Sequence, residues 1–414
     1  MSAAPGRSQA SSQRRPEVEG VPSSLIRIED LDVVFSDSPQ PALDLLDQGL
    51  SRDEIFKKTG LIVGVEKANL TVERGEICVL MGLSGSGKSS LLRCINGLNT
   101  VSRGRLLIEH EGAQVDVAHC SPATLKAMRT QRIAMVFQKF ALLPWLTVAE
   151  NVSLGLEMQG LASGERKKRI AEKLELVGLT QWRDKRPDAL SGGMQQRVGL
   201  ARALAMNSDI LLMDEPFSAL DPLIRQGLQD ELLDLQRKLN ITIVFVSHDL
   251  DEALKLGNNI VIMKGGQIVQ HSRPEDIVLK PANDYVRAFV AHTNPLNVLS
   301  GRSLMCPLAE CTQRDDEITL DSAADIWIRV DGQGALQGLR CGADAMPLQR
   351  WAANDDIEKL NPTPTLVNAD IGMRDALHIR YQTGHKLMLS DGERVIGVLG
   401  DRELYHALLG KAMG

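Results

Sequence analysis

The peptide Gly82-Leu-Ser-Gly-Ser-Gly-Lys-Ser89 follows directly after the apolar run Ile77-Cys-Val-Leu-Met81. Its three glycines allow backbone N–H groups to point at phosphate oxygens without a side chain in the way. A helix that begins behind the loop adds the positive end of its dipole to the same site. Lys88 is placed to reach the β- and γ-phosphates of a nucleotide, and the Ser89 hydroxyl is placed to ligate Mg²⁺. A buried strand, a phosphate-binding loop and a helix therefore predict an α/β domain.

Two further peptides lie well downstream of this loop, Leu190-Ser-Gly-Gly-Met-Gln-Gln-Arg197 and Ile210-Leu-Leu-Met-Asp-Glu-Pro216. Asp214 ends an apolar strand, so its carboxylate is expected at the carboxyl edge of the sheet, where it can hold Mg²⁺. Glu215 comes next and is expected to face the γ-phosphate and to polarise or deprotonate the attacking water. An isolated Asp-Glu pair at a strand end is usually only solvated. A resemblance to a known family, which includes the peptide Pro216-Phe-Ser-Ala-Leu-Asp-Pro222, favours the catalytic interpretation.

In this order the three peptides resemble those of the ATP-binding subunits of ABC transporters, over roughly residues 25–295. The resemblance implies a P-loop ABC ATPase domain with a mixed sheet core plus a helical subdomain. It also implies ATP and Mg²⁺ as cofactors. In this family the signature peptide cannot reach the ATP of its own chain, so two copies form a head-to-tail homodimer with ATP between them. ATP binding closes the dimer and hydrolysis reopens it.

The resemblance assigns roles to individual residues. The implied catalytic residues are Glu215, His248, Gln138 and Lys88. The implied ATP-binding residues are Phe35, Gly82, Ser84, Gly85, Gly87, Lys88, Ser89 and Ser90. The signature residues that act on the partner's ATP are Ser191, Gly192, Gly193 and Gln195, and Asp221 belongs to the D-loop. The implied Mg²⁺ ligands are Ser89, Gln138 and Asp214.

Two of these assignments have a plain structural alternative. Phe35 matches the aromatic residue that stacks on adenine in the family, but a core aromatic at a strand end would look the same, and Phe56 is a rival. His248 ends an apolar strand and could be a partly buried surface residue, whereas the family places it at the γ-phosphate. Gln138 matches the loop that links the ATP site to a partner.

The composition excludes several classes of protein. With 414 residues, 43% hydrophobic and 24% charged, the chain has the length of two or three ordinary globular domains. A net charge of −6 argues against nucleic acid as a partner. No apolar run approaches the roughly 20 residues that a membrane span needs. The six cysteines are scattered without a Cys-x-x-Cys pair, so free thiols are expected, Cys306 and Cys311 included.

Periodicity and composition divide the chain into segments. The N-terminal residues are rich in Ser, Pro, Ala and Arg and have no apolar core, which predicts a disordered tail and not a secretory signal. Leucines at helical spacing and the capping box of Ser51 with Glu54 predict two short helices in an insert. The expected segments are the tail 1–24, the ABC ATPase domain 25–296 with the insert at 41–60 and a helical subdomain at about 121–206, an accessory region 297–362 without assignable elements, and a C-terminal module 363–414.

The segment 363–414 resembles a single CBS module, a small α+β unit of the βαββα type. The usual ending Gly-x-x-Thr-x-x-Asp is replaced by Gly397-Val-Leu-Gly-Asp-Arg-Glu403, which argues against nucleotide binding there. CBS modules in glycine betaine importers are associated with osmotic regulation. A structural or dimer-bracing role is the alternative.

The insert 41–60 resembles that of quaternary-amine importers, and the stretch 75–98 is similar to the choline-importer branch. The resemblance therefore implies an ATPase subunit that powers choline uptake, with a glycine betaine or proline betaine importer under osmotic control as the alternative. A soluble ABC ATPase outside transport is a remote one. The implied partners are membrane permease subunits, which would dock on 140–152, and indirectly a periplasmic or extracellular binding protein. The implied location is peripheral, on the cytoplasmic face of the bacterial inner membrane.

Overall fold

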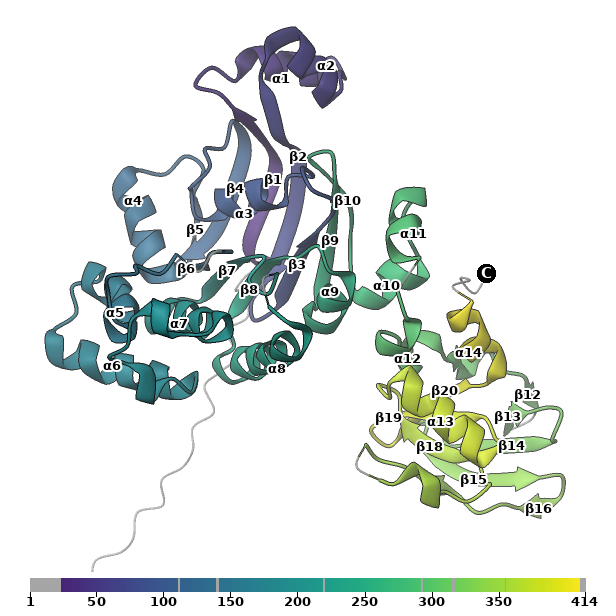
Figure 1. The fold of residues 1–414 in the computed structure, drawn as a ribbon. Helices are drawn as coiled ribbons and strands as arrows, with labels where there is room; N and C mark the ends of the chain where they lie inside the picture. The colour runs from purple at the N-terminus through teal and green to yellow at the C-terminus, as the bar shows by residue number, and fades with distance from the viewer. Residues whose placement is uncertain are drawn as a thin grey trace, which may run out of the picture.

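The computed structural model describes residues 24–409, except 111, 139–140, 219, 292, 315–316 and 354. The predicted N-terminal tail lies outside the described residues up to residue 23. Two bodies follow one another along the chain, an N-terminal domain up to residue 290 and a C-terminal domain from residue 301 (Figure 1). No helix in the described part of the chain is long and apolar enough to span a bilayer.

The N-terminal domain is built on a six-stranded sheet in the order β10-β9-β3-β8-β7-β6. All neighbours in it are parallel except β9 and β10, which form a hairpin across Gly265 and Gly266. Every residue of β3, β7 and β8 is buried, as expected of parallel strands covered on both faces. The strands are β3 (Ile77–Met81), β6 (Ile133–Val136), β7 (Ile210–Asp214), β8 (Thr242–Val246), β9 (Asn259–Lys264) and β10 (Gln267–Ser272).

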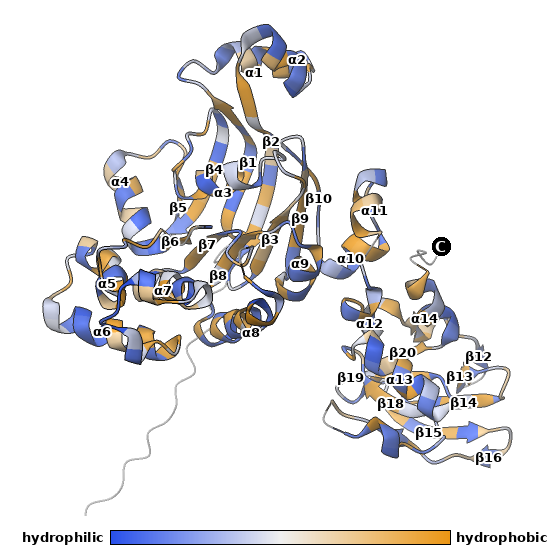
Figure 2. Cartoon of the chain, viewed as in Figure 1, coloured by the Kyte–Doolittle hydropathy of each residue, from blue (hydrophilic) through white to orange (hydrophobic). Residues whose placement is uncertain are grey.

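A second, antiparallel sheet has the order β2-β1-β4-β5. Its strands are β1 (Ser24–Phe35), β2 (Ile62–Glu73), β4 (Arg103–His110) and β5 (Ala113–Asp116). Strand β1 has an irregularity at Asp30, whose φ is 45°. Helix α3 (Lys88–Ile95) buries Leu91, Leu92 and Ile95 in the hydrophobic core between the two sheets. Figure 2 shows hydrophobic residues, in orange, along these strands.

The insert between β1 and β2 contains α1 (Gln40–Asp47) and α2 (Arg52–Thr59). Ser51 and Glu54 form the capping box of α2, and Gly60 ends the helix in the left-handed conformation. Leu43, Leu46 and Ile55 are buried in a small core of the insert's own, together with residues of β1 and β2. The insert is therefore a packed lobe and not a loop (Figure 1).

The other helices of the N-terminal domain contact the six-stranded sheet or pack on neighbouring helices. They are α4 (Pro122–Ala127), α5 (Val148–Met158), α6 (Ser163–Leu176), α7 (Gly192–Ala205), α8 (Pro222–Leu239), α9 (Leu250–Leu256), α10 (Pro274–Leu279) and α11 (Asp284–Val290). Strand β6 lies within 121–206, where the sequence shows mainly helical periodicity. It has only four residues, so pairing with β7 and not periodicity defines it.

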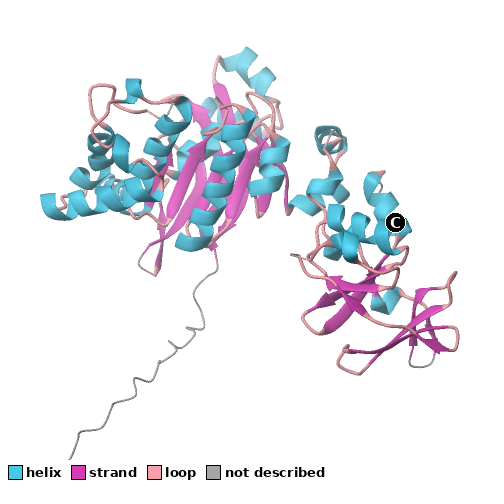
Figure 3. Ribbon diagram, turned by 60° about the horizontal axis from the view of Figure 1, so that its bottom comes forward, coloured by secondary structure: helices cyan, strands magenta, loops and turns pink. Residues whose placement is uncertain are grey.

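The C-terminal domain contains two five-stranded sheets, and its helices lie on one side (Figure 3). One sheet has the order β11-β20-β19-β18-β17 and carries the expected βαββα unit. Its strands are β11 (Cys306–Pro307), β17 (Gln349–Arg350), β18 (Thr365–Asn368), β19 (Leu387–Asp391) and β20 (Arg394–Leu399). The helices are α12 (Gly301–Leu304), α13 (Met373–Thr383) and α14 (Asp401–Leu408). Together with the N-terminal domain, this confirms the expected fold class.

The region 297–362 has defined elements, although none could be assigned from its sequence. It forms the antiparallel sheet β12-β13-β14-β15-β16, with β12 (Gln313–Arg314), β13 (Glu317–Asp321), β14 (Ile326–Val330), β15 (Leu336–Cys341) and β16 (Asp344–Ala345). Ile326 and Ile328 pack against Met388 and Val398 of the other sheet in one hydrophobic cluster. The βαββα sheet is thus covered by this second sheet on one face and by helices on the other.

Candidate active site

The phosphate-binding loop lies between β3 and α3, and two of its glycines are required by close backbone contacts. Gly82 has a φ of 143°, and a Cβ atom there would lie 2.2 Å from the Met263 carbonyl oxygen. Gly87 precedes α3 with a φ of 102°, and its Cβ would lie 2.5 Å from the Gly64 carbonyl oxygen. The loop therefore fits tightly against β2 and β9, with its N–H groups in front of α3.

A cavity of about 390 Å³ opens in front of this loop. Its lining consists of Ser84, Gly85, Ser86, Gly87, Lys88, Ser89, Ser90, Glu215 and His248. The buried Lys88 donates from Nζ to the carbonyl oxygens of Gly82, at 2.9 Å, and Leu83, at 3.2 Å. Burial lowers the pKa of Lys88, while the charges of Glu215 and Asp214 oppose this shift. A buried ammonium group at the edge of a cavity lined by N–H groups is suited to bind an anion such as a phosphate.

Ser89 and Asp214 come together at one end of the cavity. The Ser89 hydroxyl donates to Asp214 Oδ1 at 2.8 Å, and Asp214 is buried at the end of β7. A hydroxyl and a carboxylate at this distance supply the hard oxygen ligands that Mg²⁺ prefers, so these residues fit the expected metal. Arg93 Nη2 also donates to Asp214 Oδ2, at 2.9 Å. Arg93 was not singled out in the sequence, although it lies one helical turn after Ser89 on α3.

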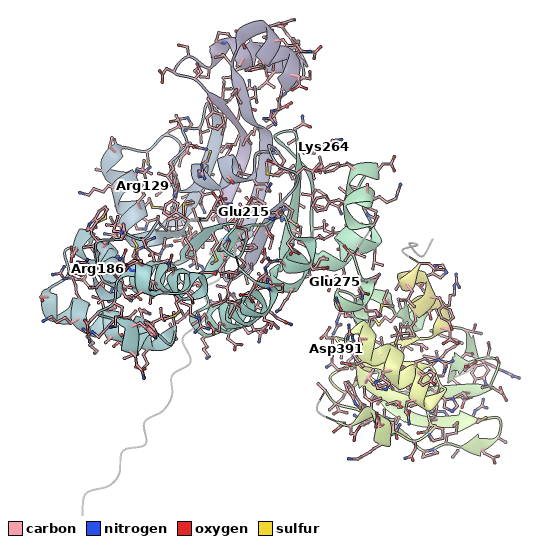
Figure 4. All side chains as sticks on the ribbon, in the orientation of Figure 1. Arg129, Arg186, Glu215, Lys264, Glu275 and Asp391 are labelled. Atoms are coloured by element: carbon pink, nitrogen blue, oxygen red, sulfur yellow. The ribbon has the colours of Figure 1, made fainter. Side chains whose placement is uncertain are left out.

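Glu215 lies at the carboxyl end of β7 in a left-handed conformation with a φ of 46° (Figure 4). Its backbone N–H donates to the Val246 carbonyl oxygen at 3.1 Å. Gln138 Nε2 donates to Glu215 Oε2 at 2.9 Å, and His248 Nδ1 lies 3.5 Å from the same oxygen. Three residues that are far apart in the sequence thus meet at one carboxylate beside the phosphate-binding loop.

The signature residues do not line this cavity. Ser191 caps α7 through a hydrogen bond from the Met194 N–H, and Gly192 is exposed. The side-chain amide of Gln195 donates to the carbonyl oxygens of Pro187 and Leu190, so it holds the signature peptide in place. Asp221 caps α8 in the same way as Ser191 caps α7. The start of α7 is therefore exposed and lies outside the cavity of the chain's own loop.

The two candidate adenine-binding aromatics are both about half exposed. The Phe35 ring lies on the backbone of β2, because a Cβ atom at Gly64 would be 2.7 Å from it. Phe56, on α2, lines a second and larger hollow of about 760 Å³ that reaches Gly85 of the phosphate-binding loop. Phe35 does not line either cavity.

Comparison with known proteins identifies the family. Residues 65–218 match the family model described as ABC transporter. The glycine betaine/proline betaine transport system ATP-binding protein ProV of Escherichia coli is 50% identical over 279 residues, which cover 67% of this chain and 69% of ProV. The glycine betaine transport ATP-binding protein OpuAA of Bacillus subtilis is 48% identical over 338 residues, covering 80% and 79% of the two chains.

Among solved structures, the chain is similar to the bacterial ABC transporter cassette MJ0796, which was solved as a dimer. The TM-score is 0.51 at 30% sequence identity, and the match covers 60% of this chain and 98% of the cassette. The match to OpuAA covers 80% of the chain and so must continue beyond residue 296. The phosphate-binding loop with Lys88, and the carboxylate pair Asp214 and Glu215, lie within the residues 65–218 that match the family model. The chain belongs to the ATP-binding proteins of ABC transporters and is an ATPase coupled to transport.

Proposed function

We propose that this chain is the ATPase subunit of an importer for betaine-type quaternary amines, with glycine betaine or proline betaine as the transported class. The observation that carries the proposal is the 48% identity to OpuAA across 80% of the chain, C-terminal domain included in part. ProV supports the same class with 50% identity. Choline, which the sequence favoured, has less support, because both relatives are named for betaines.

In the proposed reaction the loop binds the ATP phosphates, and Lys88 turns from the loop carbonyls to the β- and γ-phosphates. Ser89, Asp214 and Gln138 would hold Mg²⁺, which would neutralise charge on the phosphates. Glu215 accepts a proton from water as the water oxygen attacks the γ-phosphorus and the bond to the β-phosphate oxygen breaks, which leaves ADP and phosphate. Gln138 and His248 orient the Glu215 carboxylate and the γ-phosphate.

The proposed assembly is a head-to-tail homodimer on the cytoplasmic face of the inner membrane. Its ATP sites would be completed by the exposed start of α7 from the other copy, since a helix N-terminus favours an anion. The permease subunits would dock on the segment before α5, where the Trp145 side chain is 65% exposed. An exposed indole side chain at this position is consistent with a surface that contacts the permease. A periplasmic or extracellular binding protein would deliver the substrate without touching this chain.

The role of Glu215 is tested by changing Glu215→Gln, which removes the proton acceptor and keeps the size of the side chain. ATP binding should remain, and steady-state hydrolysis should fall by about 10²- to 10⁴-fold. The exposed Glu172 on α6 offers a matched control, and Glu172→Gln should hydrolyse ATP like the unmodified chain. Near-normal turnover of the Glu215→Gln protein would contradict the role of Glu215.

The transported class is tested by uptake of labelled glycine betaine and labelled choline into cells that carry either the unmodified chain or the Glu215→Gln form. Glycine betaine uptake that is lost in the variant, and that excess choline does not reduce, is the expected result. Choline uptake that resists glycine betaine would instead support the choline branch. Comparing low with high osmolarity tests whether the C-terminal domain regulates uptake or only braces the dimer.

A further inference from the structure

The hollow beside Gly85 is formed by the insert and not by the ATPase core alone. Its walls come from α2, from the start of β2, from the turn between β9 and β10, and from the phosphate-binding loop itself. A volume of about 760 Å³ lies within the range of cavities that hold small organic ligands, so it can accommodate a nucleoside. The hollow adjoins the phosphate-binding loop at Gly85, so a nucleotide whose phosphates lie on the loop can reach it.

The charged residues that line the hollow favour the nucleoside part of a nucleotide over its phosphates. Asp53, Glu54 and Glu66 line it together with Arg52 and Lys264, so the carboxylates outnumber the cations and a triphosphate inside the hollow would meet a net repulsion. An uncharged base and ribose meet no such repulsion, and Phe56 offers them a half-exposed aromatic ring. The phosphates therefore belong on the loop side, and the nucleoside belongs in the hollow.

Arg52 lies at the boundary between the hollow and the loop. Its Nη1 donates to the Gly85 carbonyl oxygen at a long 3.4 Å, and among the described residues Arg52 forms no salt bridge within 4.0 Å. Burial lowers the pKa of Arg52, while the charges of Glu66 and Asp53 oppose this shift. A half-buried guanidinium with one weak bond next to a phosphate-binding loop can gain strong bonds from a phosphate ligand.

We propose that α2 of the insert forms the outer wall of the ATP site, with the Phe56 ring stacked on adenine and the Arg52 guanidinium bound to the nucleotide phosphates. The inference rests on the ATP-binding role of the chain and assigns the adenine contact to the insert instead of to Phe35. The Phe35 ring packs on Gly64 and does not line the hollow. Stacking of a base on an aromatic side chain contributes enough affinity to be measured in a single variant.

The test is calorimetric titration of the full chain with ADP and, separately, with inorganic triphosphate, which has no base. Phe56→Ala should weaken ADP binding about tenfold and leave triphosphate binding unchanged. Phe56→Trp keeps an aromatic ring and should restore ADP affinity. Arg52→Gln should weaken both ligands by about five- to tenfold, whereas Lys58→Gln, on an exposed residue of the same helix, should weaken neither.

ADP affinity of Phe56→Ala equal to that of the unmodified chain would overturn the proposal, and so would a loss confined to Phe35→Ala. Equal loss of ADP and triphosphate binding in Phe56→Ala would also overturn it, because it would mean damage to the loop and not a lost base contact. Failure of the unmodified chain to bind ADP would instead refute the ATP site itself. The Lys88→Ala variant, which lacks the buried ammonium group, shows how weak ADP binding becomes when the ATP site itself is damaged.

Discussion

At the scale of single residues, Glu215 shows that the site stores backbone strain. A non-glycine residue in the left-handed region costs about 1–2 kcal/mol, and Glu215 has a φ of 46°. The backbone hydrogen bond to Val246 and the side-chain bond from Gln138 hold it there. This conformation turns the carboxylate from the end of β7 toward His248 and the cavity. Strain of this kind is found where function requires a particular side-chain direction.

Gly87 provides a prediction at the same scale. Gly87→Ala should abolish measurable ATP binding, because the added Cβ would lie 2.5 Å from the Gly64 carbonyl oxygen and force the loop away from β2. The matched control is Gly160→Ala, since Gly160 has a similar positive φ of 73° but open space around its Cβ position. The control should lose about 1 kcal/mol of stability from backbone strain and bind ATP normally. Titration with ATP measures the first effect and thermal unfolding the second.

At the scale of elements, a cluster of charges ties together three strands of the second C-terminal sheet. Arg340 on β15 donates from Nε to both carboxylate oxygens of Glu317 on β13, at 2.9 Å each. Arg329 on β14 lies 3.3 Å from the same carboxylate. The hydrogen bond and charge of Arg340 hold the pKa of Glu317 below its usual range. The cluster therefore adds cross-strand side-chain interactions to the backbone pairing of these three strands.

The expected pH dependence follows from this lowered pKa. A carboxyl group with a depressed pKa in the folded state contributes stability above its unfolded pKa, near 4.5, and this contribution is lost as the pH falls through the folded pKa. Glu317→Gln should therefore lower the unfolding temperature of the C-terminal domain at pH 7 but not at a pH below the folded pKa. Thermal unfolding followed by circular dichroism from neutral to acidic pH measures the difference. Glu310→Gln, on an exposed residue nearby, should show no such trend; a difference that persists in acid would rule out the charge explanation.

At the scale of the whole molecule, the phosphate-binding loop and the signature peptide, which the proposed dimer would bring together, do not meet within one chain. The loop and Glu215 line one cavity, whereas the signature peptide caps α7 at an exposed position elsewhere. A head-to-tail pair would place the loop of each copy against the signature peptide of the other. The symmetry of such a pair produces two equivalent sites, each with residues from both copies.

Mixing two inactive variants tests this arrangement directly. Lys88→Ala damages the loop and Ser191→Arg damages the signature peptide, so each homodimer should be inactive. A mixed dimer retains one intact site, so an equimolar mixture should regain up to about a quarter of the normal ATPase rate, since half of the dimers are mixed and each has one of two sites. The double variant mixed with either single variant is the control, because none of the dimers in those mixtures contains an intact site. No recovery in the first mixture would contradict the shared site.

Much of this architecture was predictable because its signals are local. The βαββα order of 363–409 follows from strand and helix periods that span several residues each. The sheet of 297–362 was not predictable, because β12 and β16 have two residues each and exist only through their pairing with neighbours. Strand β6 was not predicted either, because it is short and is defined by its pairing with β7.

The chemistry of the loop, the carboxylate pair and the family could be inferred from residue types at fixed short spacings, without a structure. Which distant residues share a site depends instead on how the chain folds. The tertiary structure joined Gln138 and His248 to Glu215, brought Arg93 to Asp214, and set the insert helix with Arg52 and Phe56 beside Gly85. These contacts connect segments that are separate in the chain, and no local period encodes them. They arise because burial of the two hydrophobic cores fixes the sheets and helices against one another.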